Sequence, residues 1–177
     1  LKERGANVRC VLTAGGTQFV APLTLSALSE DKVYTEIFSL TDEAEMGHIQ
    51  LSRDADLLVV APASADIMAR MAGGLANDLA TTVLLATDKP VMFVPAMNVR
   101  MWEHPATQAN IKTLESRGLT RIGPNSGNMA CGEYGLGRMS EPLEVVEAIE
   151  GFFAGMRRPL LGRRALVTSG PTREAID

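Results

Sequence analysis

Hydroxyl groups and glycines follow two of the apolar runs in this sequence of 177 residues. Thr13 and Thr17 flank the pair Gly15–Gly16 in TAGGTQF, where hydroxyls and backbone amides can cradle a phosphate or a ring edge. A tight turn between a strand and a helix explains the same residues equally well. Ser64, in APASAD, is typical of a helix N-cap, and it would also aim its hydroxyl and the first free amides of the helix at an anion or a ring.

A different kind of signal lies in the stretch PAMNVRMW, residues 95–102, which follows the apolar run VMFV. It places Asn98 among large apolar side chains that include the only tryptophan of the chain, Trp102. A loop has no need of such side chains, so the pattern raises the question of what the asparagine contacts.

The remaining candidates carry weaker signals. His48 lies in a predicted helix, EMGHIQLSRDADL, where a lone histidine is usually a surface or structural residue. Cys131 lies in the glycine-rich stretch 123–139, which we expect to be a long loop without secondary structure, a form that lids often take. The sequence contains no metal-ligand spacing, no nucleophile elbow and no recognisable Ser/His/Asp set, so no metal is expected.

The elements that must position these residues alternate between strands and helices. Apolar runs predict strands over residues 8–13, 56–63, 89–96 and 119–124. Spacings of three and four between apolar residues predict helices over 17–29, 64–74, 77–87, 104–118 and 141–155. Strands that are apolar on both faces and separated by helices indicate a parallel sheet in a layered α/β fold. In such sheets ligands bind beyond the carboxyl ends of the strands, where the candidate residues fall.

Composition excludes several classes of function. Hydrophobic residues make up 46% and charged residues 21%, and the net charge of −4 argues against nucleic-acid binding as the main activity. No apolar run reaches the roughly 18 residues of a membrane span. The polar start LKERGANV is unlike a signal peptide. Two free thiols, Cys10 in a predicted buried strand and Cys131, suit a reducing cytoplasm.

The two ends of the sequence suggest a larger protein. LKERGAN resembles the last turns of a helix, so we expect a strand and its loop to precede Leu1. Residues 157–177 are expected to form a linker and the start of another domain, leaving 1–156 as the main domain.

Three motifs, in order, resemble those of the flavin-containing cysteine decarboxylases. PAMNVRMW is similar to the family's Pro-x-Met-Asn-x-x-Met-Trp motif, and APASAD resembles its flavin motif with Asp66 in place of asparagine. MACGEYGLGRM resembles its substrate-recognition clamp, and RRALVTSGPTREAID resembles the start of the synthetase domain that follows the decarboxylase in bacteria. The resemblance implies a Rossmann-like (flavodoxin-like), doubly wound parallel sheet in three α/β/α layers. It also implies that the family's first strand and phosphate-gripping loop are absent from this chain.

The resemblance further implies roles for individual residues. His48 would assist decarboxylation, Asn98 would hold the substrate carboxylate, and Cys131 would donate a proton. The residues implied at the FMN site are Thr13, Thr17, Phe19, Ser64, Ala65, Asp78 and Met97. Those implied at the substrate site are Asn98, Met101, Ala130, Cys131 and Gly132.

The implied reaction is the FMN-dependent decarboxylation of 4'-phospho-N-pantothenoylcysteine to 4'-phosphopantetheine in coenzyme A biosynthesis. It passes through a thioaldehyde, which supplies the electron sink that a simple carboxylate lacks, and an enethiol. Family members assemble as trimers, or as dodecamers of trimers, with FMN and substrate between subunits. Ligase activity is not expected from the short synthetase-like segment.

Other interpretations stay open at this point. The same fold serves peptidyl-cysteine decarboxylases, flavin prenyltransferases and flavin-binding regulatory subunits, although the clamp-like loop favours phosphopantothenoylcysteine. A nicotinamide-binding domain is disfavoured because no G-x-G-x-x-G follows any predicted strand.

Overall fold

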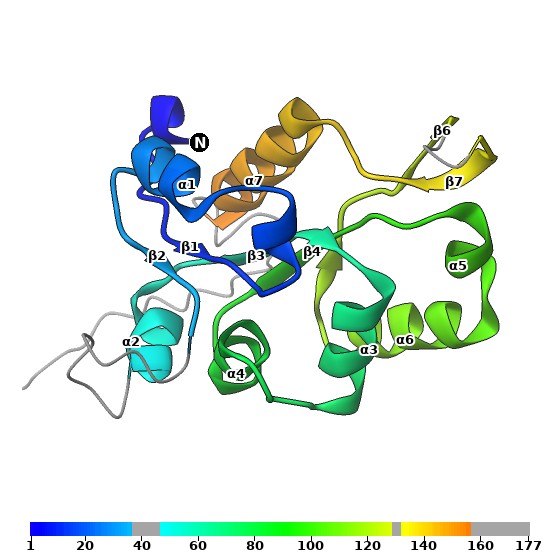
Figure 1. Cartoon of the computed structure of the whole chain (residues 1–177), viewed down its shortest axis with the longest axis horizontal. Helices are drawn as coiled ribbons and strands as arrows, with labels where there is room; N and C mark the ends of the chain where they lie inside the picture. The colour runs from blue at the N-terminus through cyan, green and yellow to red at the C-terminus, as the bar shows by residue number, and fades with distance from the viewer. Residues whose placement is uncertain (37–46, 129–131, 157–177) are drawn as a thin grey trace, which may run out of the picture.

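The computed structural model describes residues 1–36, 47–128 and 132–156 (Figure 1). Within these residues, all strand pairs in the two main ladders are parallel. One ladder joins β1 (Cys10–Val11) to β2 (Val33–Tyr34). In the other, β4 (Val91–Pro95) lies between β3 (Leu58–Ala63) and β5 (Thr120–Arg121).

Strand β4 is the centre of the molecule, since all five of its residues are buried. Successive side chains of a strand point to opposite faces, and the clusters follow this rule. Phe93 joins one cluster with Met68 and Leu114, whereas Met92 and Val94 join another, which contains residues of the last helix. Both faces of the sheet are therefore covered, as a parallel sheet requires.

Helices cover the sheet in two layers, which Figure 1 shows with α1 and α7 on one side and α2, α3, α4 and α6 on the other. The described helical segments are η1 (Lys2–Arg4), η2 (Gly16–Gln18), α1 (Pro22–Ser29), α2 (Gly47–Asp54), α3 (Ala65–Gly73), α4 (Leu79–Ala86), α5 (Val99–Glu103), α6 (Pro105–Ser116) and α7 (Pro142–Met156). The expected three-layer α/β class is thus confirmed. None of the described helices is long and apolar enough to cross a membrane.

The two ladders share a hydrophobic layer beneath α2 and α4. Leu51, Leu79 and Val83 form its buried part. Val11 and Tyr34 of the first ladder and Leu58 of the second pack against them. A single pair of helices therefore ties the ladders together, as expected for a doubly wound sheet.

The stretch 123–139 differs from the expectation of a loop without secondary structure. Strands β6 (Asn125–Asn128) and β7 (Tyr134–Arg138) pair antiparallel, so its described part is a hairpin. The prediction was wrong because glycines at 127, 135 and 137 lower strand propensity. Gly127 and Gly135 serve instead where neighbouring side chains approach the backbone closely, and Gly137 has φ of 133°.

Smaller differences concern strand limits and burial. Strands β1 and β5 are only two residues long. Strand β3 was expected to lack a wet face, but Ala61 and Pro62 are exposed. Cys10 is only partly buried, although a buried strand was expected there. The predicted helix end at the start of the chain is confirmed, since η1 ends at Gly5 with φ of 82°.

Candidate functional site

The loops after β3 and β4 meet at the carboxyl edge of the sheet. The amide of Ala96 donates to the carbonyl of Ala63 over 3.1 Å, which extends the ladder by one bond beyond β4. Ser64 and Asn98 therefore follow neighbouring strands at the same edge, where open α/β sheets bind ligands.

The loop after β1 is a tight turn with its own hydrogen bonds. Thr13 Oγ1 accepts from the amide of Gly16 at 3.1 Å, and Thr17 Oγ1 donates to the carbonyl of Ala14 at 2.7 Å. A Cβ added at Gly16 would lie 2.6 Å from Leu12 Cδ1, so an alanine there would have to displace the Leu12 side chain. Phe19 follows, with 93% of its surface exposed.

Ser64 is the N-cap of α3, as the sequence indicated. Its Oγ accepts from the amide of Ile67 at 3.3 Å, while the side chain stays exposed at the sheet edge. Ala65 begins the helix and is partly buried. The cap uses a lone pair of the hydroxyl and leaves its O–H to donate outward.

Asp66, which replaces the asparagine of the flavin motif, is paired within its own helix. Its Oδ2 lies 2.9 Å from Arg70 Nε, one turn along α3. Arg70 also reaches the carboxylate of Asp78, with 3.2 Å between Nη1 and Oδ2. One guanidinium therefore joins the first turn of α3 to the start of α4.

Asp78 is the N-cap of α4 in a capping box. Its Oδ1 accepts from the amide and the hydroxyl of Thr81 at 2.8 and 2.7 Å. The amide of Asp78 donates back to Thr81 Oγ1 over 3.3 Å. Its carboxylate thus serves the helix and Arg70, and a contact with FMN stays a prediction.

Asn98 is the N-cap of α5, and its two amide atoms have different surroundings. Its Oδ1 accepts from the amide of Met101 at 2.8 Å. No hydrogen bond to Nδ2 is found among the described residues, so the NH₂ group is left to donate to a ligand. The cap also fixes which way the carboxamide points, which sequence reasoning could not decide.

The residues around Asn98 differ in their hydrogen bonds and in their exposure to solvent. The amide of Met97 donates to the carbonyl of Gly137 over 3.0 Å, so it is not free to bind a flavin. Met101 is 45% exposed, whereas Trp102 is 8% exposed and belongs to the core with Phe93. Met101 is thus available at the surface, and Trp102 anchors α5.

Thr13, Ser64 and Asn98 share one pattern. Each uses an acceptor atom to satisfy backbone amides of its own loop. Each keeps a donor, which is a hydroxyl hydrogen or an amide NH₂. Such a set suits a ligand rich in acceptors, such as a carboxylate or the carbonyl edge of a flavin ring.

The other predicted residues are not joined to this edge by any described contact. His48 lies in the first turn of α2, which packs on α4, and it makes no hydrogen bond or ion pair within the described ranges. Gly132 is exposed, with φ of 82°. Ala130 and Cys131 lie outside the described residues.

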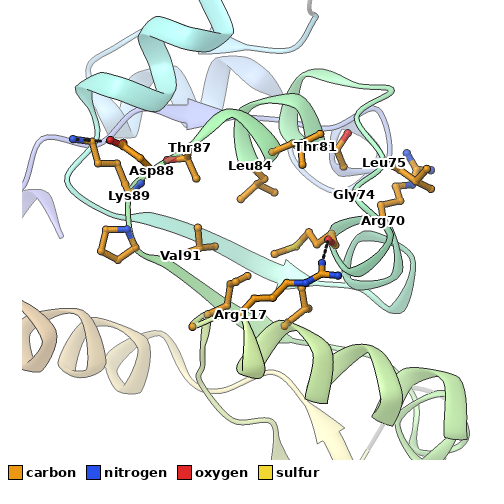
Figure 2. Close-up of a pocket in the computed structure, with 16 residues that line it drawn as sticks. Arg70, Gly74, Leu75, Thr81, Leu84, Thr87, Asp88, Lys89, Val91 and Arg117 are labelled. Atoms are coloured by element: carbon orange, nitrogen blue, oxygen red, sulfur yellow. Dashed lines mark hydrogen bonds and ion pairs between the residues drawn. The ribbon is translucent and has the colours of Figure 1, made fainter.

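A cleft of about 360 Å³ lies at the other end of the sheet (Figure 2). Lys89, Pro90 and Val91 line it at the start of β4, and Gly74 and Arg117 line it at the ends of α3 and α6. Arg117 Nη1 donates to the carbonyl of Ala72 at 2.8 Å there. None of the predicted site residues lines this cleft, so it is separate from the candidate site.

Comparisons with known proteins show the family of this chain. The family model described as Flavoprotein matches residues 1–154. The coenzyme A biosynthesis bifunctional protein CoaBC of Vibrio vulnificus is 50% identical over 177 residues, which are 100% of this chain and 44% of that protein. The chain therefore spans less than half the length of the curated relatives it matches.

Two solved structures are similar in fold and in sequence. A PPC decarboxylase mutant complexed with pantothenoylaminoethenethiol has a TM-score of 0.78 and 35% identity, covering 86% of both chains. The FMN binding protein AtHal3 has a TM-score of 0.76 and 36% identity, covering 86% of this chain and 85% of that one. These matches support a flavin as the cofactor. The chain belongs to the flavoprotein family.

Proposed function

We propose that this chain catalyses the FMN-dependent decarboxylation of 4'-phospho-N-pantothenoylcysteine in the cytoplasm, as a step of coenzyme A biosynthesis. The names of the relatives CoaBC and PPC decarboxylase support this substrate over the alternatives of the same fold. The observation that carries the proposal is the carboxamide of Asn98, whose oxygen is held by Met101 and whose NH₂ group stays available at the sheet edge.

We expect the flavin ring to lie against this edge of the sheet. Ala61 and Pro62 are exposed small residues of β3, and Phe19 exposes an apolar ring. Thr13 and Ser64 would donate to acceptor atoms of the ring. FMN held at this edge would supply two-electron redox chemistry, and oxidation of the substrate thiol to a thioaldehyde would provide the electron sink for loss of CO₂.

Asn98 would orient the substrate carboxylate through its Nδ2 hydrogens. A neutral amide holds the carboxylate without a cation that would stabilise its charge before CO₂ leaves. Trp102, buried four residues further along, holds α5 on the core, so this donor has a rigid support.

Cys131 is proposed as the proton donor that replaces the lost carboxylate on the substrate carbon, by resemblance to the clamp of the family. It belongs to the segment between β6 and β7. Cys131→Ser should therefore release CO₂ from the substrate but yield little 4'-phosphopantetheine, because serine is a far weaker acid than a thiol. An unchanged yield would remove Cys131 from the mechanism.

His48 is proposed to assist decarboxylation from a neighbouring copy of the chain. The support is that no described contact joins it to Asn98 or Ser64 within one chain, while family members form trimers with the site between subunits. A homotrimer, or a dodecamer of trimers, is the expected assembly. Light scattering after size exclusion tests it, and a monomer that is fully active would exclude this role.

The decisive experiment is mass analysis of 4'-phospho-N-pantothenoylcysteine incubated with the FMN-loaded full-length protein. Loss of CO₂ is the expected result. If the protein instead decarboxylates only a peptide that ends in cysteine, the peptidyl-cysteine alternative holds.

Asn98→Asp sharpens this experiment, because aspartate caps helices as well as asparagine does. The variant should keep its fold but lose the donor and set two carboxylates against each other. We expect turnover to fall by about a hundredfold or more, by analogy with the loss of a single positioned donor. Near-normal turnover would refute the contact with the carboxylate.

A further inference from the structure

Strand β7 contacts the backbone on both sides of Asn98. On one side the amide of Met97 donates to the carbonyl of Gly137 over 3.0 Å. On the other side Gly135 lies against Val99: a Cβ added at Gly135 would lie 3.0 and 3.2 Å from the two methyl groups of Val99. Residues 97–99 are thus held by one edge of the hairpin.

The two glycines of β7 have different reasons to be glycine, since Gly137 has φ of 133°, which side chains rarely adopt, whereas Gly135 lies against Val99. Gly135 and Gly137 share one face of the strand, while Tyr134 and Leu136 lie on the other face and are 73% and 46% exposed. Gly135 also has φ of 159°, a conformation that side chains rarely adopt, so an alanine there would be strained by its own backbone as well as by the contact with Val99. Glycine within a strand commonly marks such a close approach.

The base of the hairpin is anchored to the sheet. A Cβ at Gly123 would collide with the buried Ser140 Oγ, so the two ends of the hairpin meet there without space between them. Asn125 Nδ2 donates to Glu144 Oε2 at 2.6 Å in the first turn of α7. Helix α7 packs on Met92 and Val94 of β4. The hairpin therefore connects residues 97–99 with the central strand β4 through α7.

We propose that the contact between Gly135 and Val99, together with the bond from Met97 to Gly137, positions the carboxamide of Asn98 for the substrate carboxylate. Gly135 and Val99 are then positioning residues of the reaction, and this role rests on the proposed function. Asn98 lies between the two contacts. A side chain at residue 135 that pushes β7 away from Val99 should therefore shift Asn98, the N-cap of α5, and displace its free NH₂ group.

Gly135→Ala in the FMN-loaded full-length protein tests the proposal, with Gly151→Ala as a matched control. A Cβ at Gly151 meets nothing within 4 Å. For Gly135→Ala we expect KM for the carboxylate-bearing substrate to rise about tenfold or more, the scale of a misplaced contact. The inhibition constant of 4'-phosphopantetheine, which lacks the carboxylate, should change less than about twofold, since it does not use Asn98.

The double variant Val99→Ala/Gly135→Ala removes the methyl groups that a Cβ at 135 would meet. It should restore the part of the lost affinity for the carboxylate-bearing substrate that comes from the clash, while the backbone strain at residue 135 remains. Val99→Ala alone, which creates space without a clash, should raise the same KM by a smaller factor. Equal loss for both ligands in Gly135→Ala, or no rescue in the double variant, would overturn the proposal.

Hydrogen exchange separates this inference from the proposed function, because it needs no substrate. The amide of Met101 reports the cap by Asn98 Oδ1, and the amide of Met97 reports the bond to Gly137. Both should exchange faster in Gly135→Ala and return toward wild-type rates in the double variant. Unchanged exchange of Met101 would overturn the positioning role even if the enzyme decarboxylates its substrate. Failure of the wild type to release CO₂ would overturn the proposed function alone.

Discussion

The two parallel ladders differ in how firmly they are packed. Every residue of β4 is buried, and helices cover both of its faces. The four residues of β1 and β2 are only partly buried. The segments that follow the two ladders differ in the same way. Helix α5, after β4, is held by the buried Trp102, whereas the loop after β1 is held by hydrogen bonds within the loop.

The apolar side chains that follow β1 are more exposed than those of α6, which covers one face of β4. Phe19, Leu23 and Leu28, which follow β1, are 93%, 80% and 69% exposed. On the β4 side, Ile111 and Leu114 are 4% and 1% exposed. A firmly packed half is thus combined with a half that exposes apolar side chains after β1.

Of the changes considered for the two halves, removal of the Phe93 ring should destabilise the protein most. The side chain is fully buried between β4 and the helices α3 and α6. Phe93→Ala should lower the free energy of unfolding by about 3–5 kcal/mol, since it leaves a large cavity in a layer that cannot collapse. Urea unfolding followed by circular dichroism measures the change. A loss below about 1 kcal/mol would mean that the β4 half is less rigid than its burial indicates.

Removal of the N-cap of α4 would weaken the packing between the two ladders, because this helix contacts both Val11 of the first ladder and Leu58 of the second. Asp78→Ala should cost about 1–2 kcal/mol, as it removes the capping box and one partner of Arg70. Asp88→Ala is the control, since Asp88 is 83% exposed and lies 3.9 Å from Lys89 Nζ. It should cost less than about 0.5 kcal/mol. Equal losses in thermal unfolding would contradict the role of the cap.

Shortening Val11 tests the packing of the less buried ladder, which contains β1 and β2. Val11→Ala removes two partly buried methyl groups, so the free energy of unfolding should fall by about 1 kcal/mol. Amides near β1 should lose more protection from hydrogen exchange than amides of β4 do. If both strands lost protection equally, the ladders would unfold as one unit.

The sequence predicted the firmly packed half better than the open half. Runs such as those of β3 and β4 are long and apolar, so their strands were evident, and Ser64 was recognisable as a cap. Strand β2, with Val33 and Tyr34 alone, is too short to produce a pattern. Helix α5 was missed for the same reason, since it spans five residues.

The candidate site could be predicted by residue type but not by orientation. The position of Asn98 after a buried strand marked it, yet only the amide of Met101 shows which of its two polar atoms is free. The contact between Gly135 and Val99 joins residues 36 positions apart in sequence (135 − 99), which no local pattern reveals. The alternating glycines of β7 were its one available signal.

The cap formed by Asn98 also bears on how this protein would age. Asparagine is among the thermally labile residues, and deamidation converts its side chain to a carboxylate. Because aspartate is an equally good N-cap, deamidation of Asn98 that yields aspartate would leave α5 and the unfolding curve unchanged. An old preparation that contains this product would then pass tests of folding although the NH₂ donor of Asn98 is lost, and intact mass, which rises by about one dalton per deamidation, would reveal the change.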